Sequence, residues 1–132
     1  MTQEEEKNLL LKDLCTRLPY GVRYRHFTWN DEYGETYIAA QIYSINTDGY
    51  VKNCHDDETV YIDNVRPYLF PLSSMTEEQK KEYQYITERW MNDPVYSISD
   101  SIDWLNKHHF DYRGLIEKGL ALEAPKEMYK TE

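Results

Sequence analysis

The chain has 132 residues, a formal net charge of −9, 40% hydrophobic residues and 30% charged residues. This length and apolar content predict a single folded domain spanning residues 1–132, and they argue against a disordered chain. Acidic residues outnumber basic ones throughout the sequence, which argues against direct binding to the phosphate backbone of DNA or RNA.

The two cysteines, Cys15 and Cys54, are too few for a disulfide framework. The stretch 3–6 is acidic, whereas an export signal has a basic region followed by an apolar one. No apolar run approaches the ~20 residues that span a bilayer. These features predict a soluble cytoplasmic protein with two free thiols and no membrane association.

A helix is expected over residues 3–17. Thr2 and Glu5 have the spacing of a capping box at its start. Leu10, Leu14 and Leu18 then form an apolar stripe at helical spacing, with Cys15 beside it. The turn residues 19–21 end the helix, whose stripe is expected to face the core.

Antiparallel strands are predicted over residues 22–65. Side chains alternate in character along 22–29, and the stretch 36–45 is apolar on both faces, which favours a central position in a sheet. The connections between these runs are short, as at Asp48–Gly49. The expected topology is therefore a four-stranded antiparallel meander, either a curved sheet or a partial barrel.

The stretch 66–75 has two prolines and several large apolar residues, so we expect a buried connector there. Beyond it, the patterns predict two to three helical segments packed with the sheet, followed by a frayed tail. Their expected bounds are 76–91 and 99–109 for the helices, 112–118 for a short helical turn capped by Asp111, and 126–132 for the tail. The predicted fold class is α+β.

Four side chains set the expected orientation of the 99–109 helix. Ile98, Ile102 and Leu105 are predicted to face inward, with Trp104 at the flank. The preceding helix is expected to begin with a second capping box, formed by Thr76 and Gln79.

Two groups of titratable residues are candidates for a chemical site. His108 and His109 lie near Asp103 and Asp111, but adjacent helical positions point about 100° apart and do not share one ion easily. The simpler interpretation is a helix end at which cationic histidine meets the negative dipole.

Cys54 and His55 precede three acids, yet a zinc site normally has four ligands in two separated pairs. No catalytic nucleophile, cofactor-binding loop or metal site is predicted.

The surface offers two further kinds of candidate. Tyrosine accounts for 13 residues, and its ring with a polar end suits binding surfaces. The expected partner-binding residues are Arg23, Arg25, Trp29, Tyr33, Tyr37 and Tyr50. The acidic clusters that would imitate phosphates are Asp31, Glu32, Glu35, Asp56, Asp57 and Glu58.

Three stretches, Leu9–Val22, Arg66–Thr76 and Asp103–Ala121, resemble small proteins of Bacteroides-type gut bacteria and of their phages or mobile elements. The resemblance covers both ends of the chain and the connector, whereas the strands between them diverge. That group has no established activity, so it supplies no site residues. It implies a bacterial intracellular setting and a phage or mobile-element origin.

The sequence therefore favours a non-enzymatic module that binds and modulates a host protein through its strands. The alternative is an acidic nucleic-acid mimic that inhibits a host defence nuclease, in the manner of anti-CRISPR proteins. A small enzyme or metal-binding protein using Cys54, His55 or His108 is the third hypothesis.

Overall fold

The computed structural model describes residues 1–132 except 31, 33, 57, 89–93 and 130–132. Helix α1 (Gln3–Arg17) begins at Thr2, whose Oγ1 accepts a hydrogen bond from the Glu5 N–H at 3.1 Å. The remaining helices and strands are β1 (Arg23–Asn30), β2 (Gly34–Ile45), β3 (Tyr50–Asn53), β4 (Thr59–Tyr61), β5 (Tyr68–Leu69), α2 (Glu77–Glu88), α3 (Pro94–Lys107) and β6 (Leu122–Glu123). No helix in these described ranges is long and apolar enough to cross a membrane.

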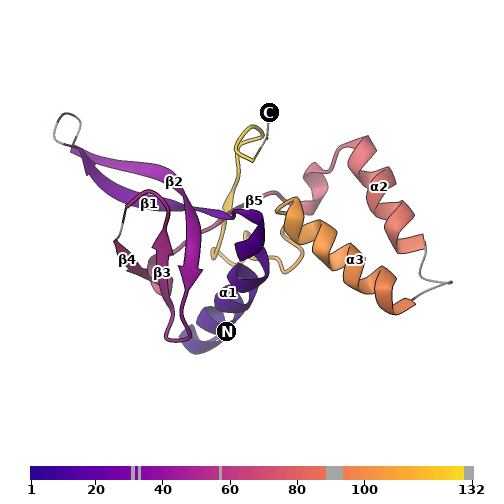
Figure 1. The fold of residues 1–132 in the computed structure, drawn as a ribbon, viewed down its shortest axis with the longest axis horizontal. Helices are drawn as coiled ribbons and strands as arrows, with labels where there is room; N and C mark the ends of the chain where they lie inside the picture. The colour runs from indigo at the N-terminus through magenta and orange to yellow at the C-terminus, as the bar shows by residue number, and fades with distance from the viewer. Residues whose placement is uncertain (31, 33, 57, 89–93, 130–132) are drawn as a thin grey trace.

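The predicted α+β fold and its four-stranded antiparallel meander are confirmed. The strands lie in the order β1-β2-β3-β4, and the sheet curls into a half-barrel (Figure 1). Helix α1 buries Leu10 and Leu14 in a core cluster with Val22, which precedes β1, and with sheet side chains such as Ile42 and Val51. Burial of a leucine side chain stabilises a fold by about 2 kcal/mol, so this interface holds α1 in place.

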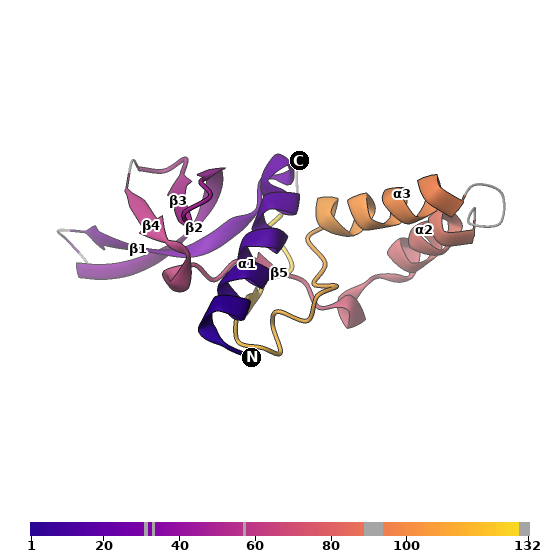
Figure 2. The same ribbon diagram turned by 90° about the horizontal axis from the view of Figure 1, so that it is seen from below.

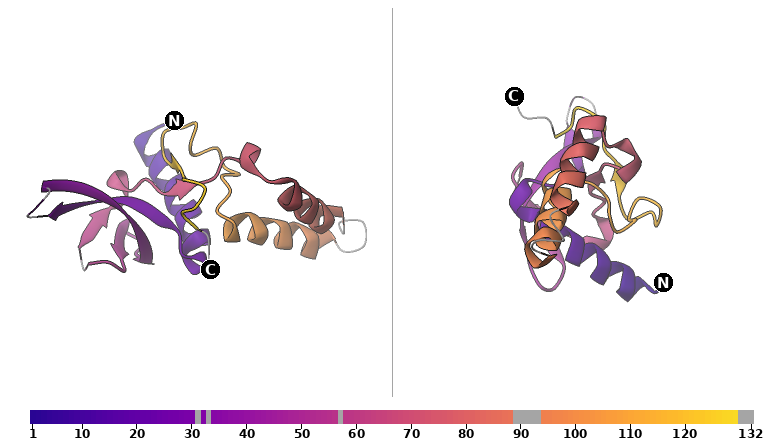
Figure 3. Two further views of the ribbon diagram at one scale, coloured as in Figure 1. Left: turned by 90° about the horizontal axis from the view of Figure 1, so that it is seen from above. Right: turned by 90° about the vertical axis from the view of Figure 1, so that its right-hand side faces the viewer.

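The α2–α3 pair lies on the other side of α1 from the sheet (Figure 2). The hairpin of β1 and β2 and the α2–α3 pair extend in opposite directions from the middle of the molecule (Figure 3). A second apolar cluster, built on Trp104, Leu105 and Phe110, joins the α2–α3 pair to the connector residue Phe70. The hairpin is thus left projecting from one end.

The connector is only partly buried, which corrects the expectation for 66–75. Its first half carries strand β5, which pairs in parallel with β6, and Leu69 there is fully buried. The second half turns outward at Leu72, which is 45% exposed, and the two serines that follow are also exposed. The β5–β6 pairing joins segments more than 50 positions apart, and such a pairing leaves no local sequence signal.

Helix α2 begins with the expected capping box, because Thr76 N–H donates to Gln79 Oε1 and Gln79 N–H donates to Thr76 Oγ1. The predicted end of this helix near residue 91 lies outside the described residues. Helix α3 starts at Pro94 and not near Ser99, because the fixed φ of proline suits the first helical position.

The predicted inward face of α3 is confirmed at Leu105, which is buried, but was wrong at Ile98 and Ile102. Ile98 and Ile102 are 52% and 41% exposed, whereas Ser97, Ser101 and Trp104 are buried. Ser97 Oγ donates to the Ile86 carbonyl at 2.7 Å, so a small hydroxyl side chain lets α2 approach α3 closely. Serine in a helix gave no apolar signal, and the sequence pattern therefore selected the neighbouring isoleucines.

The 112–118 segment forms hydrogen-bonded turns and not a helix. Asp111 caps it as predicted, because its carboxylate accepts the N–H groups of Leu115 and Ile116, each at 2.9 Å.

The tail is not frayed at Tyr129, whose hydroxyl accepts from the Arg23 N–H and donates to the Tyr68 carbonyl, both at 2.8 Å. Residues 130–132 lie outside the described part of the chain.

Replacing Tyr129 with phenylalanine is expected to lower the free energy of unfolding by about 1–3 kcal/mol, because the Tyr68 carbonyl and the Arg23 N–H lose a partner in a half-buried site. Urea unfolding followed by tryptophan fluorescence measures this change. Tyr96→Phe is the matched control on exposed α3 surface and is expected to change stability by less than about 0.5 kcal/mol. Equal stability of the two variants would contradict the role assigned to the Tyr129 hydroxyl.

Candidate functional site

The β1–β2 hairpin presents a continuous aromatic surface, which we call the hairpin face and define as Arg25, Phe27, Trp29 and Tyr37. Alternation along β1 sends the three odd-numbered residues outward, while Tyr24 and His26 are buried on the opposite side. Phe27 pairs across the strands with Tyr37. Phe27, Trp29 and Tyr37 are 44%, 68% and 59% exposed, so they offer a wide apolar area to solvent.

Contacts within the hairpin face hold three of its side chains, those of Arg25, Phe27 and Tyr37. The rings of Phe27 and Tyr37 meet edge to face with centroids 5.8 Å apart. The guanidinium carbon of Arg25 lies 4.9 Å from the centroid of the Tyr37 ring. Aromatic pairs and cation–π contacts of this kind each stabilise by roughly 0.5–1.5 kcal/mol, so the face is partly ordered before any partner arrives.

The backbone at the outer edge of β1 is also available. Arg25 N–H points away from β2 and donates to the Arg66 carbonyl at 3.2 Å. By the alternation of antiparallel pairing, the N–H and C=O groups of Phe27 and Trp29 point to that same edge. No strand pairs with them there among the described residues. An unpaired edge of this kind can accept an added strand.

A cavity of about 300 Å³ opens beside this edge. Its walls include Arg25, Phe27 and Tyr37 of the hairpin face together with Glu58 and Arg66 from the opposite side of the half-barrel. The cavity therefore continues the aromatic surface inward and adds polar groups to it.

Three of the six predicted partner-binding residues, Arg25, Trp29 and Tyr37, belong to the hairpin face. Arg23 is half-buried at the start of β1, and its backbone is bonded to Tyr129. Tyr50 is exposed on β3, where its ring meets that of Tyr61 at 5.3 Å. Tyr33 lies outside the described residues. Phe27 was missed, although it shares the two-residue alternation of Arg25 and Trp29.

The acidic candidates fall in two places. Glu35 lies opposite Trp29 in the hairpin, and Glu32 is exposed in the turn between β1 and β2. Asp31 and Asp57 are outside the described residues. Asp56 and Glu58 lie in the segment between β3 and β4.

Asp56 is engaged with its neighbours and is not simply displayed to solvent. Burial acts to raise its pKa, but the Glu58 N–H and the side chains of His26 and Asn53 stabilise the carboxylate and hold the pKa below its ordinary value. Because these donors occupy the carboxylate oxygens, Asp56 is a poor imitation of a free phosphate.

The histidines at the end of α3 do not gather with their neighbouring acids. His109 is buried and stacks on the Tyr129 ring with centroids 3.7 Å apart, whereas His108 packs on Trp104. Asp111 is committed to the turn it caps.

Burial, followed by the nearby Arg17 guanidinium, lowers the pKa of His109 to about 4. His109 is therefore neutral at pH 7, which corrects the expectation of a cationic histidine at the helix end.

Both cysteines are exposed and free. This corrects the placement of Cys15 beside the buried leucine stripe of α1. Cys54 and His55 lie in the turn after β3, where both side chains face solvent.

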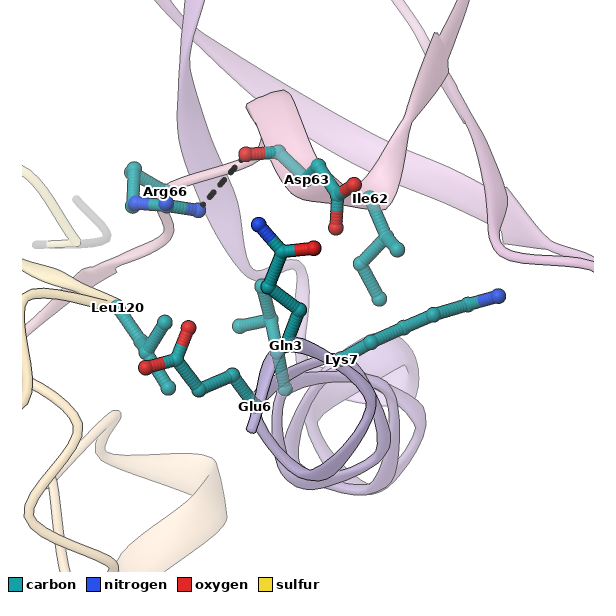
Figure 4. A pocket seen from close by; sticks show the side chains of 8 residues that line it. Gln3, Glu6, Lys7, Ile62, Asp63, Arg66 and Leu120 are labelled. Carbon is teal, nitrogen blue, oxygen red and sulfur yellow. Dashed lines mark hydrogen bonds between the residues drawn. The ribbon is translucent and has the colours of Figure 1, made fainter. Parts of the chain in front are cut away.

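A second cavity, of about 210 Å³, lies between α1 and the segment that follows β4 (Figure 4). Glu6 and Lys7 line it from α1, and Asp63 and Arg66 line it from the facing segment. Arg66 Nη1 donates to the Asp63 carbonyl at 3.1 Å. The cavity has two acids and two bases, so its charges balance and it favours no one sign of ligand.

No protein-family model matches this chain, and no curated protein or solved structure matches it either.

Proposed function

We propose that this chain is a non-enzymatic module of phage or mobile-element origin that binds and modulates a host protein through the hairpin face. The single observation that carries the proposal is the exposure of Phe27, Trp29 and Tyr37 on one side of a projecting hairpin. Tryptophan, tyrosine and arginine are the residues most enriched among binding hot spots. Scattered exposed apolar residues are common, but a continuous row of aromatic rings on a protruding element is typical of an interaction site.

Two further features support the same surface. The rings of Phe27 and Tyr37 contact each other, and Arg25 packs on Tyr37, so ordering these side chains on binding costs little conformational entropy. The free edge of β1 supplies backbone donors and acceptors next to the rings, which suits an extended partner segment. Side-chain pockets then decide which segment binds, and the neighbouring cavity of about 300 Å³ serves that purpose.

The test is affinity purification from the native host with three matched baits. The first bait is the natural chain, the second carries Phe27→Ala, Trp29→Ala and Tyr37→Ala, and the third carries Tyr85→Ala and Tyr96→Ala. Tyr85 and Tyr96 are 68% and 67% exposed on the α2–α3 pair, which makes them a fair control for loss of exposed rings.

A partner held by the hairpin face is expected on the first and third baits and absent from the second. With the purified partner, the hairpin variant is expected to bind at least roughly 30-fold more weakly, since a single aromatic hot spot contributes about 2 kcal/mol or more. Equal binding by the hairpin variant would overturn the proposal. A steep loss of binding with added salt would favour the acidic mimic instead, because screening weakens charge-driven association.

A further inference from the structure

Three ligand-type side chains converge at the seam between the two edges of the half-barrel. His26 comes from β1, whereas Asp56 and Glu58 come from the segment between β3 and β4. His26 Nε2 lies 3.1 Å from Asp56 Oδ2 and 3.7 Å from Glu58 Oε2. One donor atom from each of the three lies within 4.8 Å of the other two.

We propose that His26, Asp56 and Glu58 bind a divalent transition-metal cation of the Zn²⁺ type. Zinc takes imidazole nitrogen and carboxylate oxygen at about 2.0–2.2 Å, so neighbouring ligand atoms in a tetrahedral site lie roughly 3.3–3.6 Å apart. The two distances from His26 Nε2 straddle that range. One imidazole with two carboxylates is a donor set for Zn²⁺ or Mn²⁺ and a poor one for Ca²⁺ or Mg²⁺, which prefer oxygen alone.

A set of outer partners orients these ligands. The Tyr24 hydroxyl lies 3.1 Å from His26 Nδ1 and accepts a hydrogen bond from Asn53 Nδ2 at 2.9 Å. Asn53 is fixed in turn, since its Oδ1 accepts the backbone N–H groups of His55 and Asp56. Metal-binding histidines almost always hold their second ring nitrogen in such a contact.

Without a metal ion, His26 Nε2–H donates to Asp56 Oδ2 at 3.1 Å, and the Tyr24 hydroxyl donates to Nδ1. A metal ion would take the place of the Nε2 proton and would move the ring proton to Nδ1. When Nδ1 carries the ring proton and donates it to the Tyr24 oxygen, the Nε2 lone pair faces the two carboxylates. Three acceptors directed at one point repel one another unless a cation or a proton lies between them. A metal ion and a proton therefore compete for the same place.

The exposure of the three ligands indicates from which side an ion would reach the site. The His26 side chain is 3% exposed, whereas those of Asp56 and Glu58 are 35% and 61% exposed, so an ion reaches the imidazole from the carboxylate side. The ion would join β1 to the turn before β4, and thereby close the seam between the first and last strands of the sheet. Water would complete its coordination, as in sites with three protein ligands.

The experiment is calorimetric titration of the full chain with ZnCl₂ after treatment with a chelator. One equivalent is expected to bind, and Glu58→Gln is expected to bind about tenfold more weakly or worse, because the amide oxygen carries no charge. Glu58 is largely exposed, so this variant retains the fold, which circular dichroism verifies. Failure of the natural chain to bind one equivalent, or unchanged binding by Glu58→Gln, would overturn the proposal.

A double variant, Cys54→Ser with His55→Asn, distinguishes this site from adventitious zinc on the exposed turn. It is expected to bind Zn²⁺ as the natural chain does, and loss of binding in this variant alone would refute the proposed ligand set. Zn²⁺ is also expected to raise the melting temperature of the natural chain more than that of Glu58→Gln, because a ligand stabilises the folded state in proportion to how tightly it binds there. Equal shifts in the two proteins would count against the site.

Discussion

Replacing Asp13 with alanine is expected to destabilise the fold by about 3–5 kcal/mol, because it leaves buried positive charge without a partner. The side chains of Asp13 and Arg17 are both fully buried, and Arg17 Nε donates to Asp13 Oδ2 at 2.8 Å. Arg113 Nε lies 3.2 Å from the other carboxylate oxygen, so two guanidinium groups share one carboxylate. Arg17 Nη2 also donates to the Phe110 carbonyl at 2.6 Å, which joins α1 to the segment after α3.

Urea unfolding of Asp13→Ala against the natural chain measures this effect. The control is Glu77→Ala, which removes an exposed ion pair with Lys80 at 3.3 Å and is expected to change stability by at most about 0.5 kcal/mol. The double variant Asp13→Leu, Arg17→Met is expected to be more stable than Asp13→Ala, because it removes the Arg17 guanidinium together with the Asp13 carboxylate. A change below about 1 kcal/mol for Asp13→Ala would contradict this account of the α1 interface.

Local patterns were enough to predict the elements that bury one regular face. The alternation over 22–29, the apolar run over 36–45 and the leucines of α1 are local patterns that burial enforces, so the meander and the first helix followed from the sequence. The buried face of helix α3 could not be predicted in this way, because it contains the polar residues Ser97 and Ser101. A serine that bonds a neighbouring helix backbone has no apolar signature, and the true inward face was therefore not visible in the pattern.

Contacts between distant segments were beyond the reach of local patterns. The half-buried position of Tyr129 depends on backbone groups at Arg23 and Tyr68, which are 106 and 61 positions away. In the same way, the sequence grouped Asp56 with its neighbours Cys54 and His55. In the structure its side chain contacts His26, which lies 30 positions earlier. The curvature of the sheet brings His26 and Asp56 together, and no local sequence pattern predicts that curvature.

The hairpin face was partly predictable, because exposure along a strand follows a local pattern. Arg25, Trp29 and Tyr37 stood out as large or basic residues within a strand, where alternation decides exposure. Phe27 belongs to the same series, but its residue type gives no sign of exposure, since phenylalanine is usually buried. Its exposure follows from the hairpin's projection beyond α1, which leaves one side of both strands uncovered (Figure 1).

Acid is expected to destabilise this protein through His109. Burial lowers the pKa of His109 to about 4, against 6.5 for the ordinary side chain, so the unfolded chain binds a proton more readily than the folded one. The stabilising contribution is therefore complete above pH 6.5 and is lost as the pH falls toward 4. The difference between these two values corresponds to roughly 3 kcal/mol.

His109→Asn isolates this contribution. Asparagine tolerates the left-handed backbone of residue 109, where φ is 60°, and it does not titrate. The variant loses the stacking on Tyr129 at every pH, but its free energy of unfolding is expected to fall less than that of the natural chain between pH 6.5 and 4.

Urea unfolding at several pH values in this range measures the difference. His108→Asn is the comparison: burial also lowers the pKa of His108, but its side chain is only half-buried, and a smaller part of the pH dependence is expected to disappear. Parallel pH curves for the natural chain and His109→Asn would show that protonation of residue 109 does not oppose folding.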